Sequence, residues 1–226
     1  MASRGLRLWS SLGGLVFVVL AVVGAIFLFD GPSDSSPAKM TSWYGSSSNR
    51  AHVHIGWVLT GLGLFVLIWF VAALRERVRE SEAAAPEHGT FLSTIVLMGG
   101  TVYVAVAMAG IAVTDGIRTM SDDTYHHQVY SGVIHAAGDA SYLLVVTGGV
   151  AMAALIFASS VAVRRYEILP HWVSWFGFVA GVAAIFSLFF FTMLVWLLWV
   201  AVASVLLFLR ARPATAARRE PSAATS

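Results

Sequence analysis

The sequence contains no cysteine and few charged residues. Without cysteine, the chain can form no disulfide bond, thiolate metal site or cysteine nucleophile. Only 12% of its 226 residues are charged and 58% are hydrophobic, whereas about 25% of the residues in an average soluble domain are charged. The mean hydropathy of +0.79 points the same way. This composition predicts an integral membrane protein and leaves no segment for a soluble domain.

Motifs of common enzyme classes are absent as well. The sequence has no GxSxG elbow, Walker loop, HExxH helix or pair of catalytic carboxylates. No Asp, Glu, Lys or Arg lies at the centre of an apolar run, where a charge usually marks a proton relay or ion path. The basic residues, in a chain of net charge +2, lie at the ends of the apolar runs, which argues against a nucleic-acid partner. We therefore expect neither a pump nor an enzyme, and no cofactor.

Apolar runs long enough to cross a bilayer recur along the chain. A helix needs about 20 apolar residues to cross a hydrocarbon layer about 30 Å thick. Residues 172–209 contain no Asp, Glu, Lys or Arg over 38 positions, so we expect two helices there, with a turn near 187–192 or a partly re-entrant element. The sequence thus predicts an all-α bundle of six transmembrane helices, at about residues 8–29, 55–74, 91–113, 142–163, 171–188 and 191–209.

Two polar segments interrupt these runs. Residues 30–50, DGPSDSSPAKMTSWYGSSSNR, are rich in Ser, Pro and Gly and are predicted to form a loop that offers nothing for a packed core. After residue 74 the sequence RERVRESEAAAPEHG alternates the sign of its charges at helical spacing. We expect its first half to continue the preceding helix into water.

The distribution of basic residues predicts the topology. If both ends are cytoplasmic, 11 of the 14 basic residues face the cytoplasm and three face outward, namely Lys39, Arg50 and Arg118. Five or seven crossings would place the four C-terminal arginines outside. We therefore expect a multi-pass protein of the bacterial plasma membrane, with a single transmembrane domain over residues 1–212 and a disordered cytoplasmic tail over 213–226. We also expect the first helix to be retained rather than cleaved as a signal peptide, because its apolar core is too long.

A cluster of histidines lies on the predicted outer side. The stretch HHQVYSGVIHAAGD, residues 126–139, leads into the fourth predicted helix, where His135, Asp139 and Tyr142 share one face. The second predicted helix brings His52 and His54 to a similar depth. Three ligands with an open fourth position are typical of a catalytic zinc site. The candidate ligands are His54, His135 and Asp139, with His52, His126 and His127 nearby.

A structural role for these histidines is the favoured alternative. Histidine is amphipathic and is stable at a lipid headgroup boundary, so the side chains need no metal. Haem bound between the second and fourth helices would require histidines deeper in the bundle than residue counting places them.

Small and aromatic residues within the runs predict close helix packing. Gly177 and Gly181 form a small-xxx-small pair that permits close helix approach. The same is expected of Gly56 with Thr60, Gly99, Gly100, Gly148 and Gly149. Trp196 and Trp199 fall near mid-membrane, where they fill a groove or line a cavity. The hydroxyl residues within the runs are expected to bond to carbonyls of their own helices: Thr60, Thr94, Thr101, Tyr103, Thr147, Ser159 and Ser204.

Several segments resemble a known family. They are LRLWSSLGGLVFVVLAVVGAIFLF, SWYGSSSNRAHVHIGWVLTGLGLFVLIWFVAALRERVRE, GDASYLL and LPHWVSWFGFVAG. Together they resemble a group of small six-helix integral membrane proteins common in actinobacteria, and the resemblance covers nearly the whole chain. That group has no established activity. The resemblance therefore implies the fold and adds no chemistry.

Three functional hypotheses remain. The first is a structural or partner-binding membrane component, surrounded by lipid and associated with a second copy or another membrane protein, and it is the favoured one because it requires only tight helix packing. The second is a transporter or channel for a small, weakly polar solute. It requires a cavity reaching mid-membrane, lined by Thr, Ser and Tyr or by the deep tryptophans. The third is a metal-binding or haem-binding redox protein centred on His54, His135 and Asp139.

Overall fold

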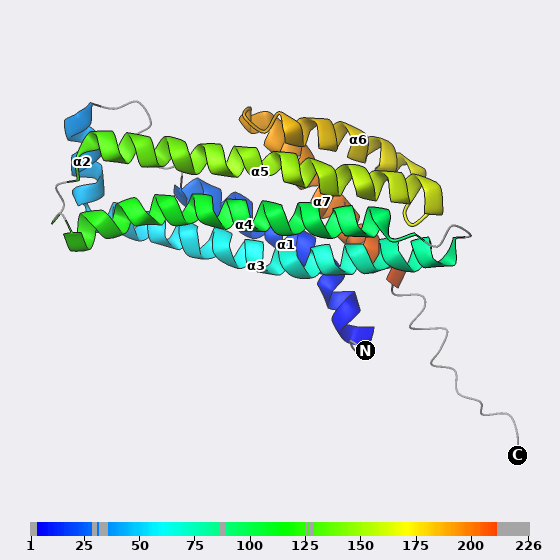
Figure 1. The fold of residues 1–226 in the computed structure, drawn as a ribbon. Coiled ribbons are helices and arrows are strands. Elements are labelled where there is room, and N and C mark those ends of the chain that lie inside the picture. The colour runs from blue at the N-terminus through cyan, green and yellow to red at the C-terminus, as the bar shows by residue number, and fades with distance from the viewer. Residues whose placement is uncertain are drawn as a thin grey trace, which may run out of the picture.

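A computed structural model describes residues 4–28, 31, 36–85, 89–124, 126 and 129–211, and these residues form helices without any strand (Figure 1). The predicted all-α class is confirmed for this part of the chain. The elements are α1 (Arg4–Leu28), α2 (Pro37–Gly45), α3 (Ser47–Ala84), α4 (Phe91–Thr119), the π-helical turn η1 (Met120–Thr124), α5 (Ser131–Tyr166), α6 (His171–Ile185) and α7 (Phe190–Ala211).

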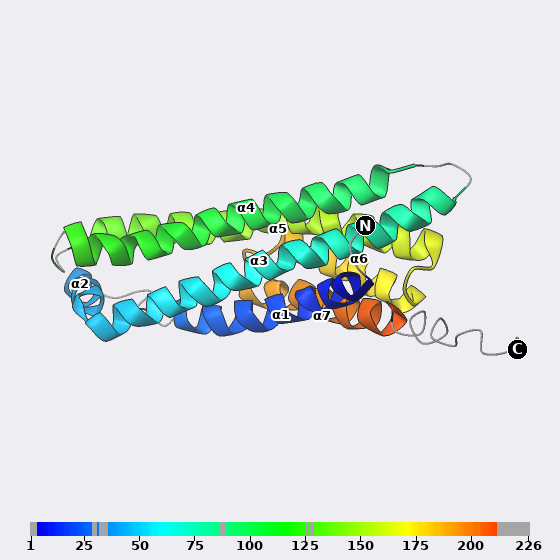
Figure 2. The same cartoon turned by 90° about the horizontal axis from the view of Figure 1, so that it is seen from below.

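Six of these helices form a closed ring in chain order. Each of α1, α3, α4, α5, α6 and α7 packs against the next, and α7 returns to α1. Figure 2 shows α3 lying between α4 and α1. Within the described residues, five of the six are long and apolar enough to cross a membrane, and α6, with 15 residues, is shorter.

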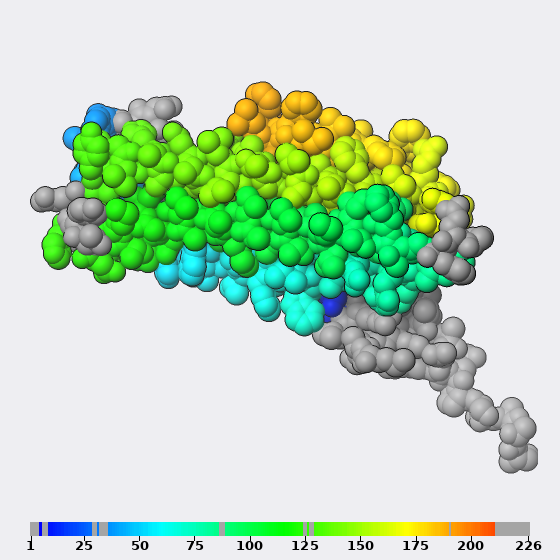
Figure 3. Space-filling view, in the orientation of Figure 1, coloured from blue at the N-terminus to red at the C-terminus, as the bar shows by residue number. Residues whose placement is uncertain are grey.

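The two ends of the ring differ. At one end, α2 lies across the ends of α3, α4 and α5, and we call this the α2 end (Figure 1). The opposite end carries Arg75, Arg164 and Arg210. The α6 helix lies beside only the C-terminal half of α5, so the N-terminal half of α5 continues past it toward the α2 end (Figure 3).

Glycines allow the closest helix contacts, as the sequence predicted. A Cβ atom on Gly56 would lie 2.9 Å from the carbonyl oxygen of Gly24, and one on Gly99 would lie 2.6 Å from that of Ala151. On α6, a Cβ atom on Gly177 would overlap the hydroxyl of Ser160. These distances are shorter than real Cβ contacts, so larger residues would force α1 from α3, α4 from α5 and α6 from α5.

Hydroxyl groups were predicted to bond within their own helices, and this is partly correct. Ser159 donates to the carbonyl of Leu155 at 2.7 Å. The prediction is wrong for Ser204, which donates to the carbonyl of Ser11 on α1 at 2.5 Å. The position of Ser204 beside α1 follows from ring closure between α7 and α1, which no local pattern encodes.

The predicted loop over residues 30–50 is wrong for its second half. Residues 37–45 form α2, and α3 begins at Ser47, well before its apolar run. Met40 and Tyr44 of α2 are buried in a cluster with residues of three other segments: Val53, Ile117, Val129 and Ile134. The Ser and Gly composition suggested a loop, but α2 buries Met40 and Tyr44 against residues that include Ile117, Val129 and Ile134, which lie far away in the chain. Burial also raises the pKa of Tyr44 to about 12, because an apolar environment disfavours the phenolate.

Arg50 fixes α2 to the ring. Its Nη1 atom donates to the carbonyls of Tyr44 and Gly45 at 2.9 and 2.8 Å, where α2 ends. Its Nη2 atom lies 3.1 Å from the Asp122 carboxylate of η1. A cation at the C-terminus of a helix also interacts favourably with the helix dipole.

Glu82 joins α3 to α4 at the opposite end. The α3 helix continues to Ala84, which confirms that the charged segment after residue 74 extends it. Glu82 is only 2% exposed, and its carboxylate accepts hydrogen bonds from the backbone N–H groups of Leu92 and Ser93 at 2.7 and 3.1 Å. These N–H groups open α4 and have no partner inside that helix.

We predict that Glu82→Ala destabilises the α3–α4 connection. Two N–H groups then lose their acceptor, which costs about 2 kcal/mol, and the midpoint of thermal unfolding in detergent should fall. The control is Glu80→Ala, because the Glu80 side chain is 42% exposed and its removal should change the midpoint little. Equal midpoints for the two variants would contradict the role of Glu82.

We predict that Arg50→Ala loosens α2. Lys39 is the single lysine of the chain and lies in α2, so a protease specific for lysine cleaves there alone and its rate reports α2 opening. Loss of three polar contacts should accelerate cleavage about tenfold, which corresponds to about 1.4 kcal/mol of opening free energy. Arg77→Ala, on the exposed surface of α3, serves as the control, and an Arg50 variant cleaved at the control rate would refute the assignment.

Candidate functional site

The described residues do not bring the predicted metal ligands His54, His135 and Asp139 together. Among the described residues, no group of three or more His, Cys, Asp or Glu side chains is placed to hold a metal ion. His135 and Asp139 are exposed on α5. His54 instead places Nδ1 3.4 Å from Asp115 Oδ1 on α4 and stacks on Trp57. The physical reason is that His54 lies on the side of α3 that faces Asp115 of α4, whereas His135 and Asp139 lie on the exposed side of α5.

The other candidate histidines do not complete the site. The His52 ring contacts Phe27 edge-on, with centroids 5.8 Å apart. His126 is exposed, with a left-handed backbone at φ 45°. His127 lies outside the described residues. Sequence reasoning did not single out Asp115, which accepts hydrogen bonds from Arg118 at 2.7 and 3.3 Å and lies beside His54.

A cavity of about 400 Å³ lies inside the ring, between its middle and the α2 end. Five helices, α1, α3, α4, α5 and α7, contribute its walls, and the α6–α7 turn contributes Ser187. None of the described residues that line it is charged. The apolar wall residues include Leu64, Ala107, Ile111, Val145, Met193 and Leu197. Cavities of this size and character are typical of sites for small molecules.

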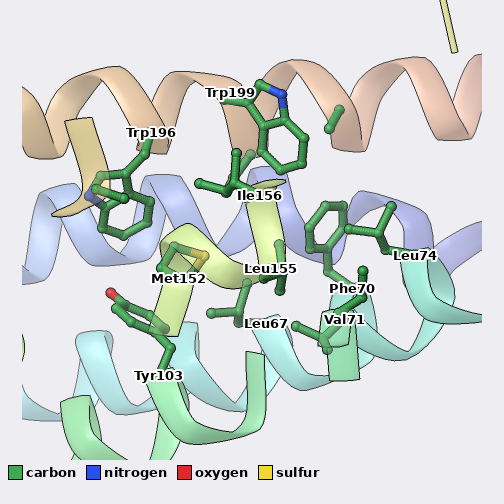
Figure 4. Close-up of a cluster of buried hydrophobic side chains, with 14 of the residues drawn as sticks. Leu67, Phe70, Val71, Leu74, Tyr103, Met152, Leu155, Ile156, Trp196 and Trp199 are labelled. Carbon is green, nitrogen blue, oxygen red and sulfur yellow. The ribbon is translucent and has the colours of Figure 1, made fainter. Parts of the chain in front are cut away.

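Three aromatic rings form the floor of the cavity. Tyr103 contacts Trp196 edge-on at 5.5 Å between centroids, and Phe17 contacts Tyr103 and Trp196 at 6.4 and 6.5 Å. Figure 4 shows Tyr103 of α4 and Trp196 of α7 pointing toward one another. Beyond them the bundle is filled by buried side chains such as Met152 and Trp199. The floor therefore closes the cavity toward the arginine-bearing end.

Most polar groups of the cavity bond to one another. Ser141 donates to the carbonyl of Gly110 at 2.8 Å, and its oxygen lies 2.6 Å from the hydroxyl of Thr114. At the α6–α7 turn, Trp196 Nε1 donates to Ser187 Oγ at 3.2 Å. These bonds leave the cavity wall largely apolar in chemical character.

Thr60 and Tyr103 differ from these other polar residues of the cavity wall in their hydrogen bonding. The Thr60 oxygen is buried without a hydrogen-bond partner in the described part of the chain, but it lies against Gly24 and belongs to the α1–α3 contact. The Tyr103 hydroxyl likewise forms no hydrogen bond with any described residue, and its ring contacts those of Phe17 and Trp196.

The cavity opens through the side of the ring. Ile26 of α1 is 66% exposed, and Leu194 of α7 and Tyr142 of α5 are 41% and 37% exposed, although all three line the cavity. The Tyr142 hydroxyl donates to the carbonyl of Leu188 at 2.5 Å, which places the α6–α7 turn beside this opening. Past that turn, no part of α6 or α7 stands between α1 and α5 (Figure 1).

The rim of this opening is apolar. The α6–α7 turn and the residues after it expose large side chains to the surroundings: Phe186, Leu188, Phe189 and Phe191. An opening onto water would expose this apolar surface at a cost of about 25 cal/mol per Å², whereas an opening onto lipid would not. The unusually apolar turn SLFFFT, residues 187–192, is the sequence feature that corresponds to this rim. No pattern in the sequence predicted the cavity behind it.

The chain matches no protein-family model, and comparisons with curated proteins and with solved structures find no significant match. Membership of the actinobacterial group that the sequence resembles therefore stays a prediction.

Proposed function

We propose that this chain is a six-crossing protein of the bacterial plasma membrane, both ends cytoplasmic, whose cavity binds a small uncharged molecule taken from the surrounding lipid. We also propose that the chain belongs to the group of small actinobacterial membrane proteins that its sequence resembles. The observation that carries it is the enclosed cavity of about 400 Å³ with an aromatic floor and an apolar side opening.

The absence of charge around the cavity favours an uncharged ligand. Moving an ion out of water costs several kcal/mol unless a partner charge compensates for it, and no lining residue offers one. A largely apolar ligand gains free energy from burial at about 25 cal/mol per Å². Because the rim is apolar, such a ligand can enter from the bilayer without crossing water.

The cavity favours solute binding over a purely structural role. The hypothesis of a carrier or channel required a cavity that reaches the deep tryptophans, and Trp196 forms part of this floor. The packed side chains beyond the floor argue against an open channel. Ligand binding, as the first step of sensing or carrying, is therefore the function that the geometry supports best.

Six crossings are supported by the position of the α6–α7 hairpin. The 15 residues of α6 rise about 22 Å, less than the hydrocarbon layer of about 30 Å. A span of this length can cross where the bilayer thins locally around it. Arg210 donates to the carbonyls of Glu167 and Ile168 at 3.0 and 2.6 Å, so the hairpin begins and ends at the arginine-bearing end, which the positive-inside rule assigns to the cytoplasm.

The topology is tested by single cysteines in this cysteine-free chain. In intact cells, a membrane-impermeant maleimide should label Lys39→Cys at the α2 end. Arg77→Cys, at the opposite end, should react only after the membrane is permeabilised. Labelling of both positions in intact cells, or the reverse pattern, would refute the proposed orientation.

The binding site is tested by filling the cavity. Anthracene is an uncharged fluorescent hydrocarbon that tryptophan excites by energy transfer, and we expect its sensitised emission to saturate with the native protein in detergent. Ala107→Phe places a ring in the cavity from a buried position on α4 and should weaken anthracene binding at least tenfold. Ala105→Phe, on the exposed face of the same helix, should bind like the native protein. Non-saturable emission, equal for all three proteins, would overturn the proposed function.

A further inference from the structure

We infer that the Tyr103 hydroxyl selects ligands that carry a neutral oxygen, as in a ketone, aldehyde or alcohol, at the end that reaches the cavity floor. This inference rests on the proposed function, because it names the class of ligand for the same cavity. It goes beyond that function in assigning a specificity residue.

The hydroxyl is the free hydrogen-bonding group at the floor. Tyr103 is 5% exposed, and its nearest aromatic neighbours are Phe17, which has no polar atom, and Trp196, whose N–H already bonds to Ser187. No described residue accepts its proton. The hydroxyl faces the cavity, so a ligand that supplies an acceptor gives it a hydrogen bond that the described residues do not provide.

The chemistry of the acceptor follows from the surroundings. A tyrosine hydroxyl can donate one hydrogen bond and accept others. A carboxylate would satisfy it as well, but its charge would be left uncompensated in a cavity without a basic residue. A carbonyl or hydroxyl oxygen meets the requirement without a charge.

The geometry also argues against a phospholipid tail as the ligand. A lipid entering through the side opening keeps its headgroup outside and reaches the floor with a terminal methyl group. That methyl would contact the three rings but leave the Tyr103 hydroxyl unpaired. A compact molecule with its oxygen leading fits both the apolar walls and the Tyr103 hydroxyl at the floor.

The Tyr142 hydroxyl provides an internal comparison. It also lies on the cavity, but it already donates to the carbonyl of Leu188 at 2.5 Å and is located at the opening. It is therefore not available as a donor to a ligand at the floor. Removing it should leave ligand selection unchanged, whereas removing the Tyr103 hydroxyl should abolish it.

The test uses 9-fluorenone and fluorene, two rigid molecules of nearly the same shape that differ by one carbonyl oxygen. Each competes with anthracene for the native protein in detergent, with correction for partition into the micelles. One added hydrogen bond contributes about 1 kcal/mol, so fluorenone should displace anthracene at about fivefold lower concentration than fluorene. In Tyr103→Phe this ratio should fall to about one, and in Tyr142→Phe it should stay near five.

The outcomes distinguish failure of the ligand-selection inference from failure of the proposed binding function. Equal competition by the two molecules on the native protein, or a preference for fluorenone that persists in Tyr103→Phe, overturns the inference while leaving the binding cavity in place. Loss of preference in Tyr142→Phe as well as in Tyr103→Phe also overturns it, because the effect would then not be specific to the floor. Failure of anthracene itself to bind the native protein overturns both the inference and the proposed function.

Discussion

Close contact between helix backbones is the constraint on which the rest of this structure depends. Helices in lipid gain little by burying apolar side chains against each other, since lipid tails are equally apolar, so association depends on van der Waals packing. Gly24 and Gly56 allow α1 to approach α3, and Gly99 does the same between α4 and α5. These contacts place α1 directly beside α3 and α4 directly beside α5, the two most extensive helix pairs of the ring.

The cavity exists where this close packing stops. The α6–α7 hairpin is shorter than the helices beside it, and Gly149 of α5 contacts α6 and its turn through Ala184 and Ser187. Past the turn, α1 and α5 face a space that no helix fills. The aromatic rings of Phe17, Tyr103 and Trp196 prevent this space from extending through the bundle. A difference in helix length thus produces an enclosed site without any irregular backbone inside it.

Contacts of charged side chains stabilise the two ends of the bundle rather than its interior. Glu82 caps the start of α4 through two backbone N–H groups, and Arg50 holds the end of α2 through two carbonyls and Asp122. Charge-assisted bonds of this kind are stronger than those between neutral groups. The interior can therefore remain free of charge, which is the property that the proposed uncharged ligand requires.

The sequence by itself determined the all-helical class with its long apolar helices, the glycine contacts and the continuation of α3 beyond its apolar run. These depend on composition, on spacing within one helix and on the length of apolar runs, all of which are local. It did not determine α2, whose buried residues meet partners from three distant segments. It likewise could not place His54 beside Asp115, or Tyr103 at the floor of a cavity. Those features depend on which helices are neighbours and where the shortest one ends, and only the packing of the complete ring decides both.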